Sequence, residues 1–302
     1  MRSIVLSDDN AMTNRIIVVR LAGGLGNQLF QFAAAVQLAD WQSIPNSCIY
    51  LDTTFISKYE TPRKFEIGFI VEAFPGINIR PPDSILASWA SRFRLARLIN
   101  FRIRGLELIG SYAYLSAIKG ASSSRVQCLD GYFQHPDLVF KREHIAQIHM
   151  KLRSSGAFNE QFRECSVRRT GLHIRRGDFI SSKNASQVFR IIPLEYYKLA
   201  LNRLPDNQKV FVFSDDPIIS KQLSEELNGT DVASLRLTLQ QEFCLLMNCD
   251  DYIIANSTFS WWAAVLGKSG EGKVISPGKW YLREDAEDFN PLNLPDFEVV
   301  DV

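Results

Sequence analysis

Short runs of β-branched and aliphatic residues alternate along the chain with longer segments of helical composition. The first run, residues 15–21, ends in a cluster of three glycines, and an Ala-rich apolar segment follows at residues 29–39. This order predicts a strand, a tight turn and a helix. Residues 48–52 predict a second strand.

The second half of the chain repeats this alternation more regularly. It predicts strands at residues 171–175, 209–214, 232–235, 251–255 and 273–276, and helices at 193–203, 217–227, 240–248 and 259–266. Strands and helices alternating at this length predict an α/β fold with a mainly parallel sheet covered on both faces. In such a sheet the binding loops follow the carboxyl ends of the strands.

The length and the change in pattern predict two domains. The chain has 302 residues, and the boundary falls between residues 150 and 168. We predict a flexible leader at 1–14, an N-terminal α/β domain at 15–160 and a C-terminal nucleotide-binding α/β domain at 161–302. A chain of this length can give each domain its own core.

Composition excludes several classes of protein. The chain has 34 Lys and Arg residues against 33 Asp and Glu, without the basic excess of a nucleic-acid binder. The apolar run at 16–22 is far shorter than the roughly 20 residues of a membrane span, and residues 1–14 lack the apolar segment of a signal peptide. The five cysteines are odd in number and have no metal-ligand spacing, so we expect a cytosolic protein with reduced thiols and no zinc.

Residues 23–28, GGLGNQ, form the first candidate site. Three glycines in four positions let the backbone turn sharply and approach a ligand closely, and the amides that open the following helix could hold an anion. The sequence is neither GxGxxG nor a P-loop, so a purely structural turn is the alternative. Asn27 and Gln28 favour a binding role because both side chains can hydrogen-bond sugar hydroxyls.

The sequence HIRRGD contains the second candidate site. Alternation along a strand places His173 and Arg175 on one face and Ile174 in the core. Guanidinium groups bind phosphate oxygens bidentately, so Arg175 and Arg176 at a strand end suit a diphosphate. Asp178 could orient an arginine or act as a base. The alternative is a surface Arg–Asp pair beside a structural histidine, which the density of charged groups at one strand end disfavours.

Two further polar clusters follow predicted strands. Asp215 and Asp216 could bind a divalent metal, a base or a ribose, or one of them could cap the next helix. The chain contains no DxD triplet, which disfavours a metal-bound diphosphate. Ser257, Thr258 and Ser260 open another helix, where hydroxyls and unpaired amides suit a phosphate.

An arginine-rich segment lies in the less regular middle of the chain. Residues 92–104, from Arg92 to Arg104, contain five arginines and no acidic residue. This segment could contact an anionic membrane surface, or it could form the ordinary solvated face of a helix.

Together the motifs resemble the bacterial α-1,2-fucosyltransferases of glycosyltransferase family 11. The matching blocks are GGLGNQLFQFA (23–33), HIRRGDF (173–179), PLEYY (193–197), VFVFSDD (210–216) and DYIIANSTFSWWAA (251–264), and residues 131–134 are similar to the family's GYWQ. The blocks occur in the family's order over almost the whole chain. The resemblance implies two Rossmann-type domains of the GT-B kind facing a cleft, and inverting transfer of fucose from GDP-fucose to the 2-hydroxyl of a galactoside.

The resemblance also implies roles for the candidate residues. Arg175 stabilises the β-phosphate, with Asp178 and Asn27 as further catalytic candidates, and Gln28 lies on the acceptor side in the N-terminal domain. The donor-binding candidates are His173, Arg176, Asp215, Asp216, Ser257, Thr258, Ser260, Gly24 and Gly26. No cofactor and no metal are expected.

The implied partners are GDP-fucose and a β-galactoside-terminated glycan or lipid-linked oligosaccharide. The implied setting is the cytoplasm, at the inner face of the membrane, in surface polysaccharide (O-antigen-type) biosynthesis. Three alternatives stay open at this point: another GDP-sugar transferase with a different linkage or acceptor, a non-catalytic glycan- or nucleotide-binding protein, and a metal-dependent nucleotide hydrolase using Asp215 and Asp216.

Overall fold

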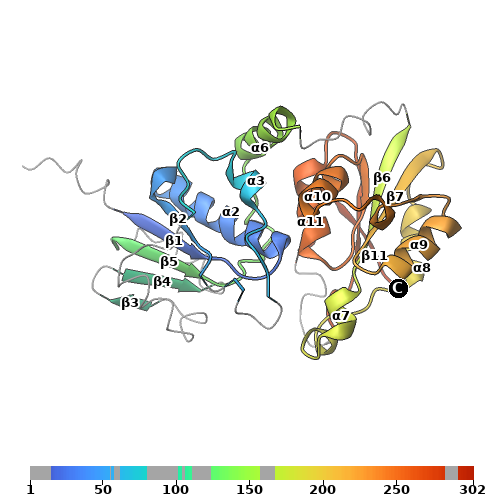
Figure 1. Ribbon diagram of the computed structural model, residues 1–302, viewed down its shortest axis with the longest axis horizontal. Helices are drawn as coiled ribbons and strands as arrows, with labels where there is room; N and C mark the ends of the chain where they lie inside the picture. The colour runs from blue at the N-terminus through green and yellow to red at the C-terminus, as the bar shows by residue number, and fades with distance from the viewer. Residues whose placement is uncertain are drawn as a thin grey trace, which may run out of the picture. The chain divides into compact units, whose positions relative to one another are not determined.

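The chain forms two compact units (Figure 1). The computed structural model describes residues 15–54, 56–57, 62–79, 101–103, 106–110, 124–156, 167–282 and 292–302. The first unit is Met1–Lys151 and the second is Leu152–Val302, whereas the sequence predicted a division after residue 160. The predicted leader, residues 1–14, lies outside the described residues.

The first unit contains a five-stranded sheet. Its strands are β1 (Ile16–Arg20), β2 (Ile49–Asp52), β3 (Phe101–Ile103), β4 (Leu106–Gly110) and β5 (Val126–Asp130), in the order β2-β1-β5-β4-β3. All neighbours are parallel except β3 and β4. The carboxyl ends of β1, β2 and β5 therefore lie at one edge of this sheet.

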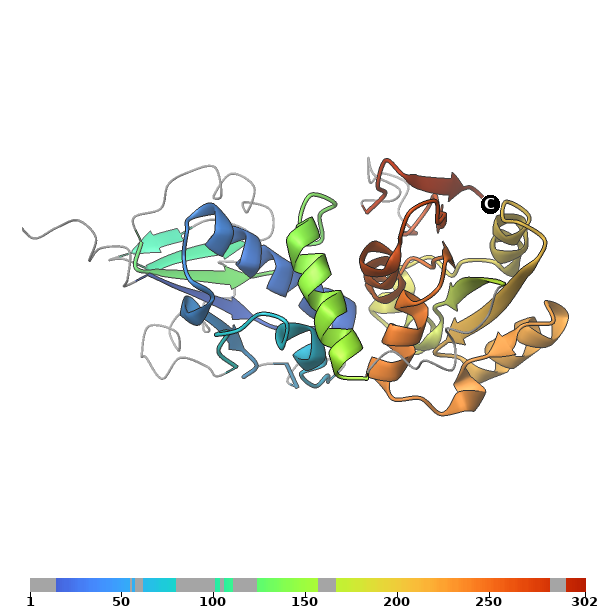
Figure 2. The same ribbon diagram turned by 90° about the horizontal axis from the view of Figure 1, so that it is seen from above.

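Helix α2 (Leu25–Trp41) follows β1, and the other described helices of this region are α3 (Gly68–Val71), α6 (Arg142–Ser154) and the short η1 (Asn46–Cys48). Helix α2 begins four residues before the predicted start at residue 29, because Gly24 has an extended backbone and serves as its N-cap. Figure 2 shows α2 (blue) and α6 (green) from above. Phe32 of α2 packs edge-on against Phe74 and Phe140, with ring centroids 5.0 and 5.7 Å apart.

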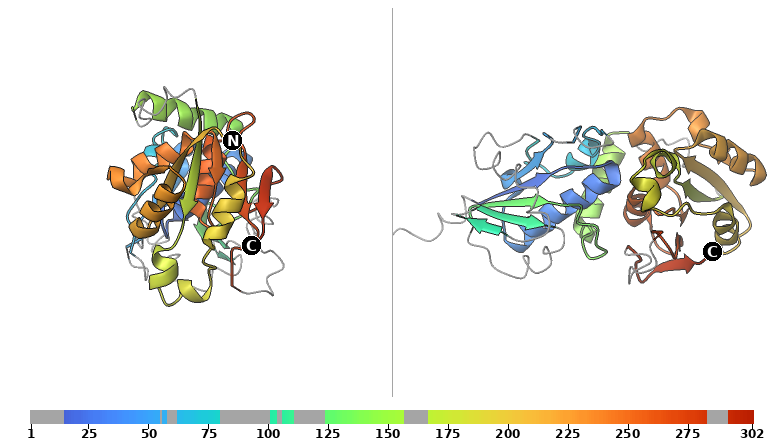
Figure 3. Two further views of the ribbon diagram at one scale, coloured as in Figure 1. Left: turned by 90° about the vertical axis from the view of Figure 1, so that its right-hand side faces the viewer. Right: turned by 90° about the horizontal axis from the view of Figure 1, so that it is seen from below.

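The second unit contains a six-stranded sheet in which all neighbours are parallel. Its strands are β6 (Arg168–Ile174), β7 (Gln208–Ser214), β8 (Thr230–Asp231), β9 (Asp251–Ile253), β10 (Val274–Pro277) and β11 (Phe297–Val300). The spatial order is β11-β10-β9-β6-β7-β8, with the red strand β11 at an edge (Figure 3). Read from the other edge this is 3-2-1-4-5-6, the doubly wound order of dinucleotide-binding folds. The order reverses between β6 and β9.

Helices cover both faces of this second sheet (Figure 1). The elements are α7 (Gly177–Ser181), η5 (Ala185–Gln187), α8 (Leu194–Leu201), α9 (Pro217–Glu226), η6 (Ala233–Leu235), α10 (Leu239–Met247) and α11 (Thr258–Gly267). One core joins α8 and α9 to the sheet through buried residues such as Tyr196, Leu223 and Ile174. Helices α10 and α11 lie on the opposite face.

The α/β class and the parallel sheets predicted from the sequence are confirmed. The strand predicted at 232–235 is wrong, since those residues include η6 and the strand is β8. Asp231 explains the difference: its Oδ1 accepts from the Ala233 N–H at 3.1 Å, and its carbonyl accepts from the Ser234 hydroxyl. Such local bonds favour a turn over a ladder.

The arginine-rich segment lies largely outside the described residues. Its described part, residues 101–103, is strand β3, so the helical interpretation is wrong there. Among the described residues no helix is both long enough and apolar enough to cross a membrane. Cys48, Cys128, Cys244 and Cys249, the cysteines of the described ranges, are not in disulfides.

Candidate active site

Polar segments follow β6, β7 and β9 at one edge of the second unit's sheet. They are residues 175–178 after β6, 215–216 after β7 and 256–258 after β9. These strands are neighbours, and the strand order reverses between β6 and β9. In doubly wound sheets this reversal point opens the crevice in which ligands bind. Most of the donor-side residues predicted from the sequence are therefore brought together here.

Arg175 is held by two carboxylates. Its Nη2 donates to Oδ1 of Asp178 at 2.6 Å, and its Nη1 lies 2.8 Å from Oδ2 of Asp215. The guanidinium carbon also lies 5.5 Å from the centre of the Phe179 ring. These charge-assisted bonds fix the plane of the guanidinium. The side chain keeps 21% exposure, so it can still meet an anion.

Asp215 links the two arginines of the motif. Its Oδ1 accepts from the backbone N–H of Arg176 at 2.8 Å, while its Oδ2 pairs with Arg175. This approach requires glycine at position 177, because a Cβ there would lie 2.4 Å from Oδ2 of Asp215. The sequence RRGD thus supplies both arginines, and its glycine leaves room for the Asp215 carboxylate that bonds to them.

Asp216 is a helix cap. Its Oδ1 accepts from the backbone N–H groups of Ile218 and Ile219, at 3.0 and 3.3 Å, at the start of α9. The capping alternative is confirmed for this residue, and its donor-binding role stays a prediction. Within the described ranges there is no group of three or more His, Cys, Asp or Glu residues that could hold a metal ion.

His173 has a buried, neutral ring near the end of β6. It is 4% exposed, and its ring lies 5.5 Å from that of Phe259 in α11. Burial lowers the pKa of His173 to about 3, against the opposing charge of Asp215 and with the help of Arg175. Its Nδ1 has no hydrogen-bond partner within the described part of the chain. An uncharged imidazole with an unused nitrogen can bond to a base or a ribose.

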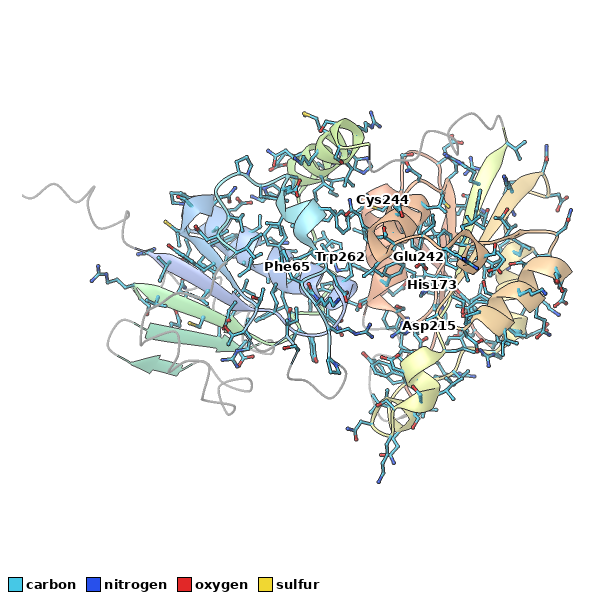
Figure 4. All side chains as sticks on the ribbon, in the orientation of Figure 1. Phe65, His173, Asp215, Glu242, Cys244 and Trp262 are labelled. Carbon is cyan, nitrogen blue, oxygen red and sulfur yellow. The ribbon has the colours of Figure 1, made fainter. Side chains whose placement is uncertain are left out.

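Glu242 in α10 is a site residue that the sequence reasoning missed. Its side chain lies on the same side of the second unit as His173 and Asp215 (Figure 4). Burial raises the pKa of Glu242 to about 7, and the charge of Asp215 adds to the shift. The available signal was an acidic residue directly before the apolar run FCLLM of this helix. A strongly shifted carboxyl beside other polar groups is typical of a functional site.

The hydroxyls after β9 divide into two kinds. Ser257 is the N-cap of α11 but makes no capping bond through its side chain, and Thr258 opens the helix. This leaves a helix N-terminus suited to an anion at the sheet edge. Ser260 is fully buried and its hydroxyl donates to the Ser257 carbonyl at 3.3 Å. The donor-binding role of Ser260 stays a prediction, and its hydroxyl lies inside the core in this structure.

The glycine motif lies at the carboxyl edge of the first unit's sheet. Gly23 has φ +74°, and a Cβ there would lie 2.4 Å from Nδ2 of Asn27. Gly24 is the N-cap of α2, whereas Gly26 is a buried residue of the first helical turn. Gly26 thus lies in a helix and not in the open turn predicted for it.

Gln28 is structural. It is fully buried, and its Nε2 donates to the carbonyls of Gly23 and Lys64, both at 2.9 Å. Its Oε1 accepts from the Glu66 N–H at 2.9 Å. These bonds occupy the amide of Gln28, and its acceptor-side role stays a prediction. Asn27 is half-buried instead, and its Oδ1 accepts from Nε2 of Gln134 at 2.8 Å.

Known proteins resemble this chain over most of its length. A sequence model described as glycosyl transferase family 11 matches residues 111–288, more than half of the chain. The O-antigen biosynthesis glycosyltransferase WbnK of Escherichia coli is 28% identical over 285 residues, which cover 86% of this chain and 93% of WbnK. An α-1,2-colitosyltransferase of Escherichia coli is 29% identical over 299 residues, which cover 91% of this chain and 96% of that protein.

Solved structures of fucosyltransferases show a more distant similarity. The fucosyltransferase NodZ from Bradyrhizobium is 16% identical with a TM-score of 0.48, covering 84% of this chain and 94% of NodZ. POFUT1 in complex with GDP is 12% identical with a TM-score of 0.43, covering 87% of this chain and 98% of POFUT1. Similarities this distant assign no residue its role.

Proposed function

Because the chain belongs to glycosyltransferase family 11, we propose that it is an inverting galactoside 2-α-L-fucosyltransferase. It transfers fucose from GDP-fucose to the 2-hydroxyl of a terminal galactose in an O-antigen-type polysaccharide. The observation that carries this proposal is Arg175, fixed by Asp178 and Asp215 at the reversal point of a doubly wound sheet. The relative named for O-antigen biosynthesis supports the polysaccharide context.

Arg175 acts on the leaving group. As the bond from fucose to the β-phosphate breaks, negative charge grows on GDP, and a guanidinium already in place stabilises it. A preorganised donor of this kind contributes about 3 kcal/mol, or roughly 100-fold or more in rate. Asp178 is a positioning residue in this mechanism because its Oδ1 is engaged by Arg175 at 2.6 Å. The amides at the start of α11 and the Ser257 hydroxyl assist at the phosphates.

His173 and Glu242 recognise the base of the donor. Guanine presents two adjacent donors, N1–H and the 2-amino group, which match the two oxygens of one carboxylate. A buried carboxylate that receives this pair rejects bases without it, because its oxygens would then stay unsatisfied. The partly buried position of Glu242, within the electrostatic influence of Asp215, supports this role. His173, neutral and buried, adds a bond to the base or the ribose.

A second candidate donor is GDP-colitose, which the colitosyltransferase relative favours. Colitose is fucose without its 3-hydroxyl, so the two donors share GDP and differ in one polar group. We propose fucose as the main substrate, with the hydroxyl recognised by side chains in the sugar subsite.

We also propose that the enzyme needs no metal and no cofactor. The chain lacks a DxD triplet, and both aspartates after β7 already have partners: Asp215 binds the arginines and Asp216 caps α9. We further propose that it works in the cytoplasm, with residues 92–104 contacting anionic lipid that carries the acceptor.

One experiment separates these functions. The protein is incubated with GDP-fucose, GDP-colitose or UDP-galactose and a panel of β-galactosides, with and without EDTA, and the product linkage is determined by NMR. We expect α-1,2-linked fucose in both conditions. A preference for GDP-colitose would establish the second donor, loss of activity in EDTA would indicate metal chemistry, and the absence of any turnover would indicate a binding protein.

A further inference from the structure

Three amide side chains on the first turns of α2 assemble the carboxyl edge of the first sheet. Gln31 is buried; its Oε1 accepts from the Ala22 N–H and its Nε2 donates to the Gly131 carbonyl, both at 2.9 Å. Gln31 thus joins the ends of β1 and β5. Gln28 attaches residues 64–66 to the glycine turn in the same way. Asn27 is the third member.

Asn27 differs from the other two because its partner is a side chain. Its Oδ1 accepts from Nε2 of Gln134, which follows β5, at 2.8 Å. Both side chains are half-buried, whereas Gln28 and Gln31 are bonded to backbone groups and almost fully buried. The Asn27–Gln134 pair is therefore the part of this amide cluster that a ligand can reach.

The backbone before Gln134 is strained in a way that serves this pair. Phe133 has φ +52°, in the left-handed region that non-glycine residues rarely adopt, and its ring is 1% exposed. Strain of this kind persists where the surrounding structure enforces it, and it gathers at ligand sites. At this position it buries the ring in the core while the chain brings Gln134 back to α2.

The glycine turn lies beside the amide of Asn27. A Cβ on Gly23 would fall 2.4 Å from Nδ2 of Asn27, so Nδ2 lies over a backbone that carries no side chain. Since Gln134 donates to Oδ1, the amide of Asn27 is oriented with Nδ2 toward this turn. The side of the Asn27 amide that faces the turn is therefore its donor side, and the hydroxyl oxygens of a hexose accept from such a donor.

We propose that Gln134 is a positioning residue that sets the donor–acceptor polarity of Asn27 toward the acceptor sugar. This inference rests on the proposed function and adds to it a residue that selects the acceptor. Gln134 acts through the Asn27 amide, so its substitution should change the KM for the acceptor and leave the affinity for GDP unchanged.

The test is a double-mutant cycle on Asn27 and Gln134 with the β-galactoside that the wild type uses best. Gln134→Ala should raise the KM for the galactoside about tenfold, the loss expected for one hydrogen bond. Gln134→Glu should raise this KM further. Its carboxylate cannot donate to Oδ1 and instead accepts from Nδ2, so the Asn27 amide rotates by about 180°. Once Asn27→Ala is present, Gln134→Ala should have no further effect on KM.

Gln37→Ala is the matched control. Gln37 lies on the same helix and donates to the carbonyls of Asp137 and Val139, in the segment that follows Gln134, without contacting Asn27. It should leave the galactoside KM unchanged. Additive effects of Asn27→Ala and Gln134→Ala, or a Gln134→Ala variant that keeps the wild-type KM, would overturn the inference.

Thermal stabilisation by GDP distinguishes a failure of the proposed function from a failure of the inference about Gln134. All variants should keep the wild-type shift with GDP, which also shows that they fold. If the wild type binds no GDP, or transfers to none of the galactosides, the proposed function fails and this inference fails with it. If GDP binding and transfer are normal but the cycle shows no coupling, only the inference fails.

Discussion

Gly177 and Asp215 fit together only because residue 177 has no side chain: a Cβ would lie 2.4 Å from Oδ2 of Asp215. Gly177→Ala should therefore displace the carboxylate that holds Arg175 and lower kcat about 100-fold. Alanine favours a helix more than glycine does at the start of α7, so the melting temperature should not fall through helix propensity. Wild-type kcat in this variant, measured with saturating donor, would show that Asp215 does not position Arg175.

Arg175→Lys should lower kcat about 100-fold, because lysine keeps the charge but not the planar fork. The matched control is Arg169→Lys. Arg169 lies near the start of β6, the strand that Arg175 follows, and is bonded to Asp250 through Nε and Nη2, at 3.0 and 3.2 Å. Arg169→Lys should lower the free energy of unfolding and leave kcat unchanged. Equal losses of kcat in both variants would contradict a specific role for Arg175.

The raised pKa of Glu242 predicts that GDP binds more weakly as the pH falls. Its pKa is raised to about 7, so its carboxylate is progressively neutralised as the pH falls through 7. The Kd for GDP should therefore rise below pH 7 in the wild type and stay flat with pH in Glu242→Gln. Isothermal titration between pH 5.5 and 8.5 checks this. A wild-type Kd that is constant over this range would exclude Glu242 from the base subsite.

The same shift predicts that Glu242→Gln is more stable than the wild type at high pH. Between the ordinary glutamate pKa and about 7, the folded state binds the proton more tightly than the unfolded state. The wild type therefore loses stability as the pH rises through this window, on the order of 3 kcal/mol when the loss is complete. Urea unfolding should show the largest difference near pH 8 and none below about pH 4.

Gln28→Ala should destabilise the first unit by about 1–3 kcal/mol, because it leaves the Gly23 and Lys64 carbonyls and the Glu66 N–H without this partner. Urea unfolding measures the effect. The GDP-induced thermal shift should not change. A variant as stable as the wild type would mean that residues 64–66 are held by other contacts.

Part of this site could be predicted from the sequence because its residues come at the ends of predicted strands. Asp215 follows the apolar run VFVF, His173 and Arg175 lie at the end of the strand predicted at 171–175, and parallel pairing of β6 with β7 brings those ends together. Chain order alone was enough to place them. The strand predicted at 232–235 failed because one side chain, Asp231, bonds to the backbone ahead of it, and composition does not report such a bond.

Other residues needed the fold itself. Glu242 comes from a helix and reaches the sheet edge only because α10 crosses to the face opposite α8 and α9. Asn27 and Gln28 have similar chemistry and are adjacent, but successive residues of a helix point about 100° apart. One therefore faces the loop at 64–66 and is buried, while the other meets Gln134.

The arginines of the proposed donor site are balanced by acids. Arg175 and Arg176 carry two positive charges, and Asp178 and Asp215 carry two negative ones within hydrogen-bond distance of them. Long-range attraction of the nucleotide is therefore weak, and capture depends little on ionic strength. The same balance means that spent GDP, with its full negative charge, is not trapped by a surplus of positive potential. Such a balance of charge in the proposed donor site favours rapid exchange of product for fresh donor over tight retention.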